Sequence, residues 1–203
     1  GWRIPFIASS LLVVVGFYIR LKITETPSFE NALETKKQVK IPIMTILKSY
    51  KWELIFGTFA AVATFVTFYL MTVFSLSWAT SDLGFSRRDF LIIQLFSILF
   101  FVAGIPISAV LADKFGRKKV LVLISILILL FGFTFSFFMD SGSSAMITTF
   151  VCIGMGLMGL TYGPLGTFLS ELFPTEVRYS GASLTFNLAG ILGASFAPLI
   201  AIW

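Results

Sequence analysis

Residues 90–111 read FLIIQLFSILFFVAGIPISAVL, a stretch of 22 residues without a charged side chain. A helix needs roughly 20 mostly apolar residues to cross the hydrocarbon core of a bilayer, so this stretch is long enough. Five further apolar runs resemble it: 4–20, 52–78, 119–139, 145–170 and 181–203. None shows the period-two alternation of membrane-barrel strands. The sequence therefore predicts an all-α fold, a polytopic bundle of six membrane helices.

The composition of the chain excludes a soluble globular protein. Of its 203 residues, 57% are hydrophobic and 12% are charged, and the mean hydropathy is +0.96. An average soluble domain carries about 25% charged residues. The chain has no His and one cysteine, Cys152, which excludes an internal disulfide and Cys-based metal sites. We expect no cofactor, no metal and no enzymatic activity.

The basic residues lie mostly in the connections on one side of the predicted bundle. Twelve of the 15 Lys and Arg residues fall in the segment 21–51 and its flanks, in the loop 112–119 or at Arg178. An excess of Lys and Arg marks the cytoplasmic side of a membrane protein. This placement explains the net charge of +5 without a nucleic-acid partner, because these residues face the headgroups of the lipid bilayer. We expect a multi-pass protein of the plasma membrane, which in a bacterium is the inner membrane.

The connection 21–51 is the longest in the chain. A threonine before a proline predicts a short helix over 27–37, and a second proline predicts another over 42–50. The second is amphipathic and suited to the membrane surface. For the first, a solvated basic linker is an equal alternative.

Two charged loops stand on the same predicted face. The loop 112–119 reads ADKFGRKK, which is so short that its two helices must pack antiparallel, with Gly116 supplying a permissive backbone. Asp113 ends one helix and Arg117 opens the next, so the two can pair across the turn. Glu171 and Arg178 bring two further opposite charges, which predicts a cytoplasmic charge network. The alternative is a basic loop that sets topology and does nothing more.

These loops carry a family resemblance. The stretch D-K-F-G-R-K at 113–118 resembles the loop signature of the major facilitator superfamily, and E-L-F-P-T-E-V-R-Y-S-G-A-S at 171–183 resembles a later motif of its metabolite:proton symporter and sugar porter branches. The opening G-W-R-I-P-F, with Y-I-R and E-T-P after it, resembles the metabolite:proton symporter branch. The signature usually begins with Gly four residues before the Asp; here that residue is Ala109, which is also small.

The resemblance implies a partial major facilitator fold. The six spans would be the sixth to eleventh of twelve helices, so we expect an excerpt of a longer protein. Residues 1–20 would end the N-terminal half, 21–51 would be the cytoplasmic central loop with short helices, and 52–203 would form a C-terminal bundle of five helices. The rest of the N-terminal half and the final helix would lie outside the chain. A cytoplasmic gate that stabilises the outward-facing state would comprise Asp113, Gly116, Arg117, Lys118, Glu171 and Arg178.

Polar side chains inside apolar runs are candidates for substrate contact, because they are costly in hydrocarbon unless they face a cavity or a partner. These candidates are Asn187, Gln94, Tyr162, Thr64 and Thr67. Thr64 and Thr67 share one side of their helix with Thr72 and Ser75. For all five, hydrogen bonding between helices is the competing interpretation.

Glycines in the run 145–170 predict close helix packing. Four of them fall on one narrow stripe, Gly156, Gly159, Gly163 and Gly166, and Pro164 predicts a bend.

The membrane runs contain no acidic residue except Glu53, near the start of its run. A proton carrier is therefore expected in the missing N-terminal half. By resemblance, the protein would be a secondary active transporter of a small polar metabolite, an organic acid or a zwitterion such as proline or betaine, moved in symport with protons by alternating access. A sugar-porter-like uniporter or symporter is the alternative, and a channel or a membrane-embedded enzyme is disfavoured.

Overall fold

The fold was analysed in a computed structural model that describes residues 3–22 and 42–202. The chain divides into two compact units, Gly1–Gln38 and Val39–Trp203. In the first unit, α1 (Ile4–Lys22) is one continuous helix of 19 residues whose apolar side chains are exposed. The predicted short helix over 27–37 lies outside the described residues.

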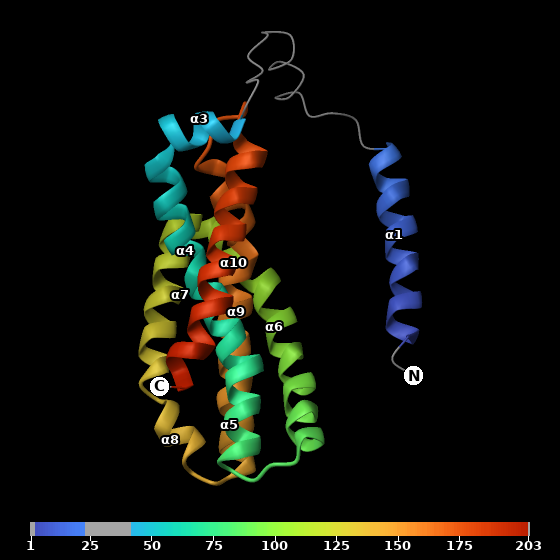
Figure 1. Cartoon of the computed structure of the whole chain (residues 1–203), viewed down its shortest axis with the longest axis vertical. Coiled ribbons are helices and arrows are strands. Elements are labelled where there is room, and N and C mark those ends of the chain that lie inside the picture. The colour runs from blue at the N-terminus through green and yellow to red at the C-terminus, as the bar shows by residue number, and fades with distance from the viewer. Residues whose placement is uncertain (1–2, 23–41, 203) are drawn as a thin grey trace. The chain divides into compact units, whose positions relative to one another are not determined.

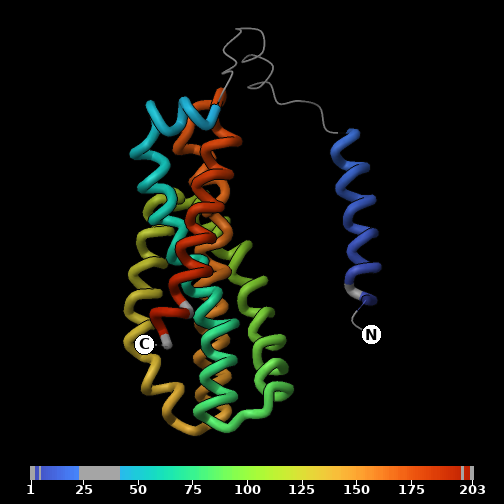
Figure 2. The backbone as a smooth tube through the Cα atoms, viewed as in Figure 1, coloured from blue at the N-terminus to red at the C-terminus, as the bar shows by residue number. Residues whose placement is uncertain are grey.

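The second unit is a bundle in which every described regular element is helical (Figures 1 and 2). Its elements, in chain order, are α3 (Pro42–Ser49), α4 (Lys51–Tyr69), the π-helix η1 (Leu70–Phe74), α5 (Ser75–Ser81), α6 (Arg87–Phe115), α7 (Arg117–Gly132), α8 (Phe135–Met139), α9 (Ser144–Glu171) and α10 (Arg178–Ile202). The helix α3 matches the second short helix predicted from the sequence. The segments α4, η1 and α5 form one uninterrupted helical run, Lys51–Ser81.

Membrane-length helices account for most of the predicted spans. Within the part of the chain that the structure describes, four helical runs are long and apolar enough to cross a bilayer: Lys51–Ser81, Arg87–Phe115, Ser144–Glu171 and Arg178–Ala201. This result confirms an all-α membrane bundle.

The span predicted over 119–139 is interrupted in the structure, which corrects the prediction of one continuous helix. The helix α7 stops at Gly132, and the amides of Phe133 and Thr134 donate three residues back, to Leu130 and Phe131. The Thr134 hydroxyl also donates to the Phe131 carbonyl, at 2.7 Å. Such tight turns end an α-helix, so α8 begins as a separate short element.

The helices α6 and α9 form the most extensive contact of the bundle, and glycines permit it. A Cβ at Gly104 of α6 would lie 2.8 Å from the Gly156 carbonyl oxygen. A Cβ at Gly159 of α9 would collide with the backbone carbonyl of Phe101, and one at Gly163 would lie 2.6 Å from the carbonyl of Ile105. Gly159 and Gly163 of the predicted stripe, together with Gly104, thus bring two backbones together. The other two glycines of the stripe are not needed for this approach, because a Cβ at Gly156 would make only an ordinary contact at 3.8 Å and one at Gly166 would meet nothing within 4 Å.

The end of the bundle that carries α3 and the loops around 116 and 174 is called the basic end below. There Ile46 of α3 is fully buried, in a cluster with Leu54, Phe173 and Val177. These side chains fasten α3 onto the starts of α4 and α10. The connections at the basic end are therefore packed onto the membrane helices.

Candidate functional site

A charged bridge joins two loops at the basic end. Arg117, the first residue of α7, contacts Glu171, the last residue of α9, through Nη1 and Oε1. Its Nη2 lies 3.9 Å from Oδ1 of Asp113. The predicted pairing across the turn is thus present, and Arg117 is the centre of the network.

The local backbone explains why this bridge forms. Gly116 has φ +90° and ψ 136°, a conformation that side-chain-bearing residues avoid, and it ends α6 and begins α7. The helix α7 begins with three cations, Arg117, Lys118 and Lys119. The N-terminus of a helix favours negative charge, so these cations are unfavourable there, and the carboxylates of Asp113 and Glu171 offset their charge. Lys118 is exposed and lines an apolar groove with side chains of α4 and α7, including Ala60 and Leu121.

Arg178 takes a different place from the one that a four-charge network requires. Its Nε donates to the carbonyl of Phe173 at 3.2 Å, which ties the start of α10 to the preceding turn. The Phe173 ring is buried and lies against Gly181, where a Cβ would be 2.5 Å from the ring. Phe173 and Gly181 thus anchor this motif, a role that the sequence pattern alone did not indicate.

A polar pocket of about 420 Å³ opens along the half of α9 nearer the basic end. It is lined by the hydroxyl-bearing residues Tyr162, Thr167 and Ser170, with the Phe186 ring from α10 beside them. Tyr162 is 42% exposed, and its ring packs edge-on against Phe101. Tyr162 was predicted from the sequence as a candidate for substrate contact, whereas Thr167 and Ser170 were not. Both follow the glycine stripe at a spacing of four residues, which is the signal that would have found them.

Asn187 lies on the exposed face of α10, one residue after Phe186. Its Nδ2 donates to the Ser183 carbonyl at 2.8 Å and lies 3.5 Å from the Ser183 hydroxyl. The amide thus remains at an open surface near the polar pocket, although it is not among the residues that line that pocket. One local bond holds it in place.

Gln94 has a different position, between helices. Its Nε2 donates to two carbonyls of η1, that of Met71 at 3.0 Å and that of Thr72 at 2.7 Å. These bonds fit the interpretation of Gln94 as a link between helices.

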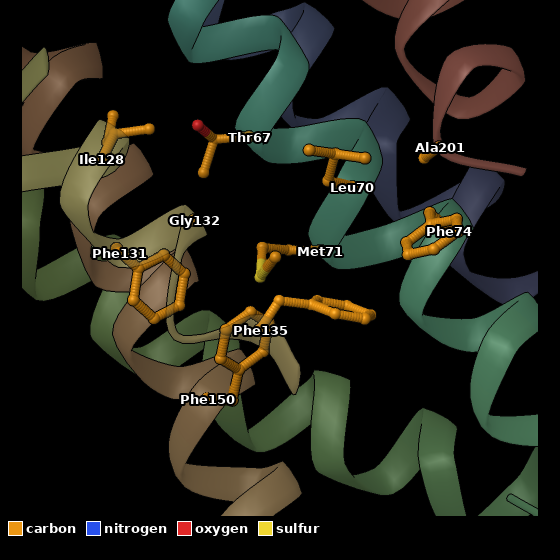
Figure 3. A pocket seen from close by; sticks show the side chains of 10 residues that line it. All are labelled: Thr67, Leu70, Met71, Phe74, Ile128, Phe131, Gly132, Phe135, Phe150 and Ala201. Carbon is orange, nitrogen blue, oxygen red and sulfur yellow. The ribbon is translucent and has the colours of Figure 1, made fainter. Parts of the chain in front are cut away.

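Thr64 and Thr67 are inside the bundle, with exposures of 2% and 4%. The Thr67 hydroxyl donates to the Ala63 carbonyl of its own helix at 2.8 Å. Thr67 also borders a cavity of about 320 Å³, whose other walls are apolar and include the rings of Phe131, Phe135 and Phe150 (Figure 3). The structure therefore separates the two threonines from the polar pocket on α9.

Together, these features describe a polytopic helical membrane protein with a polar pocket next to a charged bridge between loops. Residues 1–198 match the Major Facilitator Superfamily. The chain belongs to this superfamily, as the loop motifs predict, and is an integral, multi-pass membrane protein. The superfamily consists of transporters and not of enzymes.

Curated relatives are transport proteins. The chain is 46% identical to the inner membrane metabolite transport protein YhjE of Escherichia coli K12, over 100% of this chain and 47% of that protein. It is 30% identical to the shikimate transporter of the same strain, over 99% of this chain and 47% of that protein. It is 29% identical to the citrate-proton symporter of Klebsiella pneumoniae, over 98% of this chain and 45% of that protein. The chain thus spans about half the length of the curated relatives it matches. No solved structure matches it.

Proposed function

We propose that this chain is the C-terminal portion of a secondary active transporter of the bacterial inner membrane, which moves a small polar metabolite by alternating access. In this proposal, residues 1–20 end the N-terminal half, 21–51 form the central loop, and 52–203 form most of the C-terminal bundle. The N-terminal half of the same protein completes the transport path. The proposed substrate is an organic acid or a zwitterion such as proline or betaine. The names of the shikimate and citrate-proton relatives support an organic acid.

The polar pocket on α9 is the observation that carries this proposal. It gathers three hydroxyl-bearing residues of α9 beside an aromatic ring of α10. The Ser170 hydroxyl already donates to the Gly166 carbonyl of its own helix, at 2.8 Å. The Tyr162 and Thr167 hydroxyls are therefore the groups that a polar ligand or water would meet, and such groups are expensive in a membrane helix without one. Tyr162 and Thr167 bind the substrate in this proposal, and Asn187 contacts it from the exposed face of α10. Gln94, Thr64 and Thr67 support the helices from inside.

Proton coupling needs a titratable group on the transport path. Among the described residues of the bundle, Asp and Glu occur only in the first or last turns of helices or between helices. In our proposal the coupling carboxylate therefore belongs to the N-terminal half. The pocket lining carries no charge, so a counter-charge for an ionised substrate also belongs there.

The charged bridge acts as the cytoplasmic gate in this proposal. Arg117 connects the turn between α6 and α7 with the end of α9, and these are two separate helix connections. An ion pair that holds in one arrangement and opens in another biases a bundle with two states. Gly116 and Lys118 shape the turn, and Arg178 holds the neighbouring loop in place.

The test uses the full-length protein in proteoliposomes with an imposed proton gradient. Labelled shikimate, citrate, proline, betaine and a hexose are offered in turn, and the initial uptake rate is measured against concentration. We expect saturable uptake of one of the first four that a protonophore abolishes. Non-saturating flux would favour a channel, and hexose uptake would favour the sugar-porter alternative.

The pocket is tested with a matched pair of variants on α9. Thr167→Val removes a hydroxyl that lines the pocket, whereas Thr149→Val removes a hydroxyl of another exposed residue, which donates to the Ala145 carbonyl of its own helix. We expect the half-saturation concentration to rise several-fold for Thr167→Val alone. Equal behaviour of the two variants would remove the pocket from the substrate path.

A further inference from the structure

The helical run Lys51–Ser81 contains one irregular turn, the π-helix η1. A π-turn holds one residue more than the α-turn it replaces, so it leaves carbonyl groups without their usual partner four residues on. The first of these is the Leu70 carbonyl. It accepts hydrogen bonds from both the amide and the hydroxyl of Ser75, the latter at 2.8 Å. Inside a bilayer a carbonyl that loses its amide partner is costly, so donors from another helix stabilise a turn where this happens.

Gln94 supplies those donors from another helix. Its single amide group reaches both the Met71 and the Thr72 carbonyls, at 3.0 and 2.7 Å. The Ser97 hydroxyl donates to the backbone carbonyl of Gln94 at 2.7 Å, a bond within α6 that does not involve the Gln94 side-chain amide. The extra residue of η1 is thus stabilised by a side chain more than 20 positions away in the sequence.

The packing around η1 is tight on one side and open on the other. Gly154 of α9 accommodates the Met71 side chain, because a Cβ at this position would collide with the Met71 sulfur. On the other side Met71 and Phe74 border the apolar cavity of about 320 Å³, opposite α7 and α8 (Figure 3). The side chains of η1 therefore have room to rearrange.

We infer that Gln94 is a positioning residue that holds η1 in the π form and so decides which face α5 turns toward its neighbours. If η1 becomes α-helical, every residue after it turns by about 100° around the helix axis, because one residue of an α-helix corresponds to that angle. Ser75 and Ala79, both fully buried, would then leave the core. The two arrangements are discrete, so the Gln94 amide biases a two-state element in the outer part of this helix.

This inference adds a conformational control to the proposed transport function, and its test reads the orientation of α5 directly. In the full-length protein without native cysteines, single cysteines replace Ser75 to Ser81 in turn, and the rate of reaction with a small uncharged thiol reagent is measured. We expect protection at positions 75 and 79 and reaction at the exposed positions 77 and 81. If the protein does not transport the substrates tested, the cysteine reactivity profile of α5 is still expected. If substitution of Gln94 leaves that profile unchanged, the proposed transport function still stands.

The decisive variant is Gln94→Met, which keeps the length of the side chain and removes both donors. We expect the protection pattern to move by one residue along α5, with at least a tenfold faster reaction at position 79. The matched control is Ser97→Ala on the same helix, which removes a buried hydroxyl that does not touch η1, and here we expect the original pattern. The original pattern in Gln94→Met would overturn the inference.

A deletion tests the same inference if Gln94→Met does not fold. Removal of the half-exposed Val73 takes out the extra residue of η1, so the turn becomes α-helical while α5 keeps its native face. We expect the native protection pattern in this variant, and no additional effect of Gln94→Met in the same background. A pattern rotated by one residue after the deletion, as in an ordinary α-helix, would contradict the inference.

Discussion

Gly159→Ala is the substitution whose effect follows most directly from the packing of α6 against α9. The new Cβ would collide with the carbonyl oxygen of Phe101 and would lie 2.9 Å from its carbon and 3.0 Å from its Cα. These are backbone atoms, which cannot turn aside as a flexible side chain would. The two helices must therefore separate along their most extensive contact.

The magnitude is the difference between two opposing effects. Overpacking of a close contact costs about 1–3 kcal/mol, and here the obstacle is rigid. Replacing Gly by Ala inside a helix stabilises that helix by about 1 kcal/mol, because Ala has the higher helix propensity. The difference is about 0–2 kcal/mol, and because the obstacle is rigid we expect Gly159→Ala to lower the free energy of unfolding by an amount in the upper half of that range, about 1–2 kcal/mol.

Gly156→Ala is the matched control on the same helix. Its nearest neighbour would be the Phe100 Cβ at 3.8 Å, which is an ordinary contact. Only the helix-propensity gain remains, so this variant is expected to be as stable as the wild type or more stable by up to about 1 kcal/mol.

Thermal unfolding of the full-length protein in a mild detergent measures both variants side by side. The expected separation corresponds to a few degrees in Tm, since about 1 kcal/mol shifts the Tm of a 150–250-residue domain by roughly 2–4 °C and that of a longer chain by less. If Gly159→Ala is at least as stable as Gly156→Ala, the close approach of α6 and α9 is wrong.

Four further predictions concern the basic end and the exposed face of α10. Arg117→Ala should reduce uptake several-fold without changing membrane insertion. Asp113→Asn should have a smaller effect, because the Asp113 carboxylate lies 3.9 Å from Arg117. Uptake per inserted protein measures both variants, and rates equal to the wild type would exclude the gate. The double variant Arg117→Glu with Glu171→Arg should recover part of the lost uptake, whereas no recovery would show that the two residues act separately. Gly116→Ala should lower the free energy of unfolding by about 1–3 kcal/mol, because φ +90° is strained for a residue with a Cβ, and an unchanged Tm would contradict this conformation. Asn187→Ala should raise the half-saturation concentration at an unchanged maximal rate; a change in Tm alone would make Asn187 structural.

Much of the charged site was predictable because its members are close in the sequence. Asp113 and Arg117 stand four residues apart around Gly116, so a short turn suffices to bring them together. The partner of Arg117 was not predictable in the same way. Both Glu171 and Arg178 stand near the same membrane face, and only the packed helix ends show that Glu171 contacts Arg117 while Arg178 donates to Phe173.

The polar residues inside the membrane show the opposite case. Gln94 and Asn187 look equivalent in the sequence, as single amides in apolar runs. In the structure Gln94 meets two carbonyls of η1, whereas Asn187 stays on an exposed face with a local bond. No periodicity in one helix reveals this difference, because it depends on what the neighbouring helix presents.

The sequence by itself determined the solvent of this protein, its helical class and the side of the membrane predicted for its basic loops. Hydropathy and charge add up along the chain, so runs such as 90–111 are decided without reference to other segments. Only the tertiary structure decided that α7 ends at Gly132, that η1 is π-helical and that Thr167 and Ser170 line a pocket. At these places contacts between helices join residues that are distant in the sequence: Gln94 donates to η1, the Phe150 ring packs against Phe131 and Phe135, and Phe186 of α10 borders the pocket on α9. The energies of such contacts arise only when the helices meet.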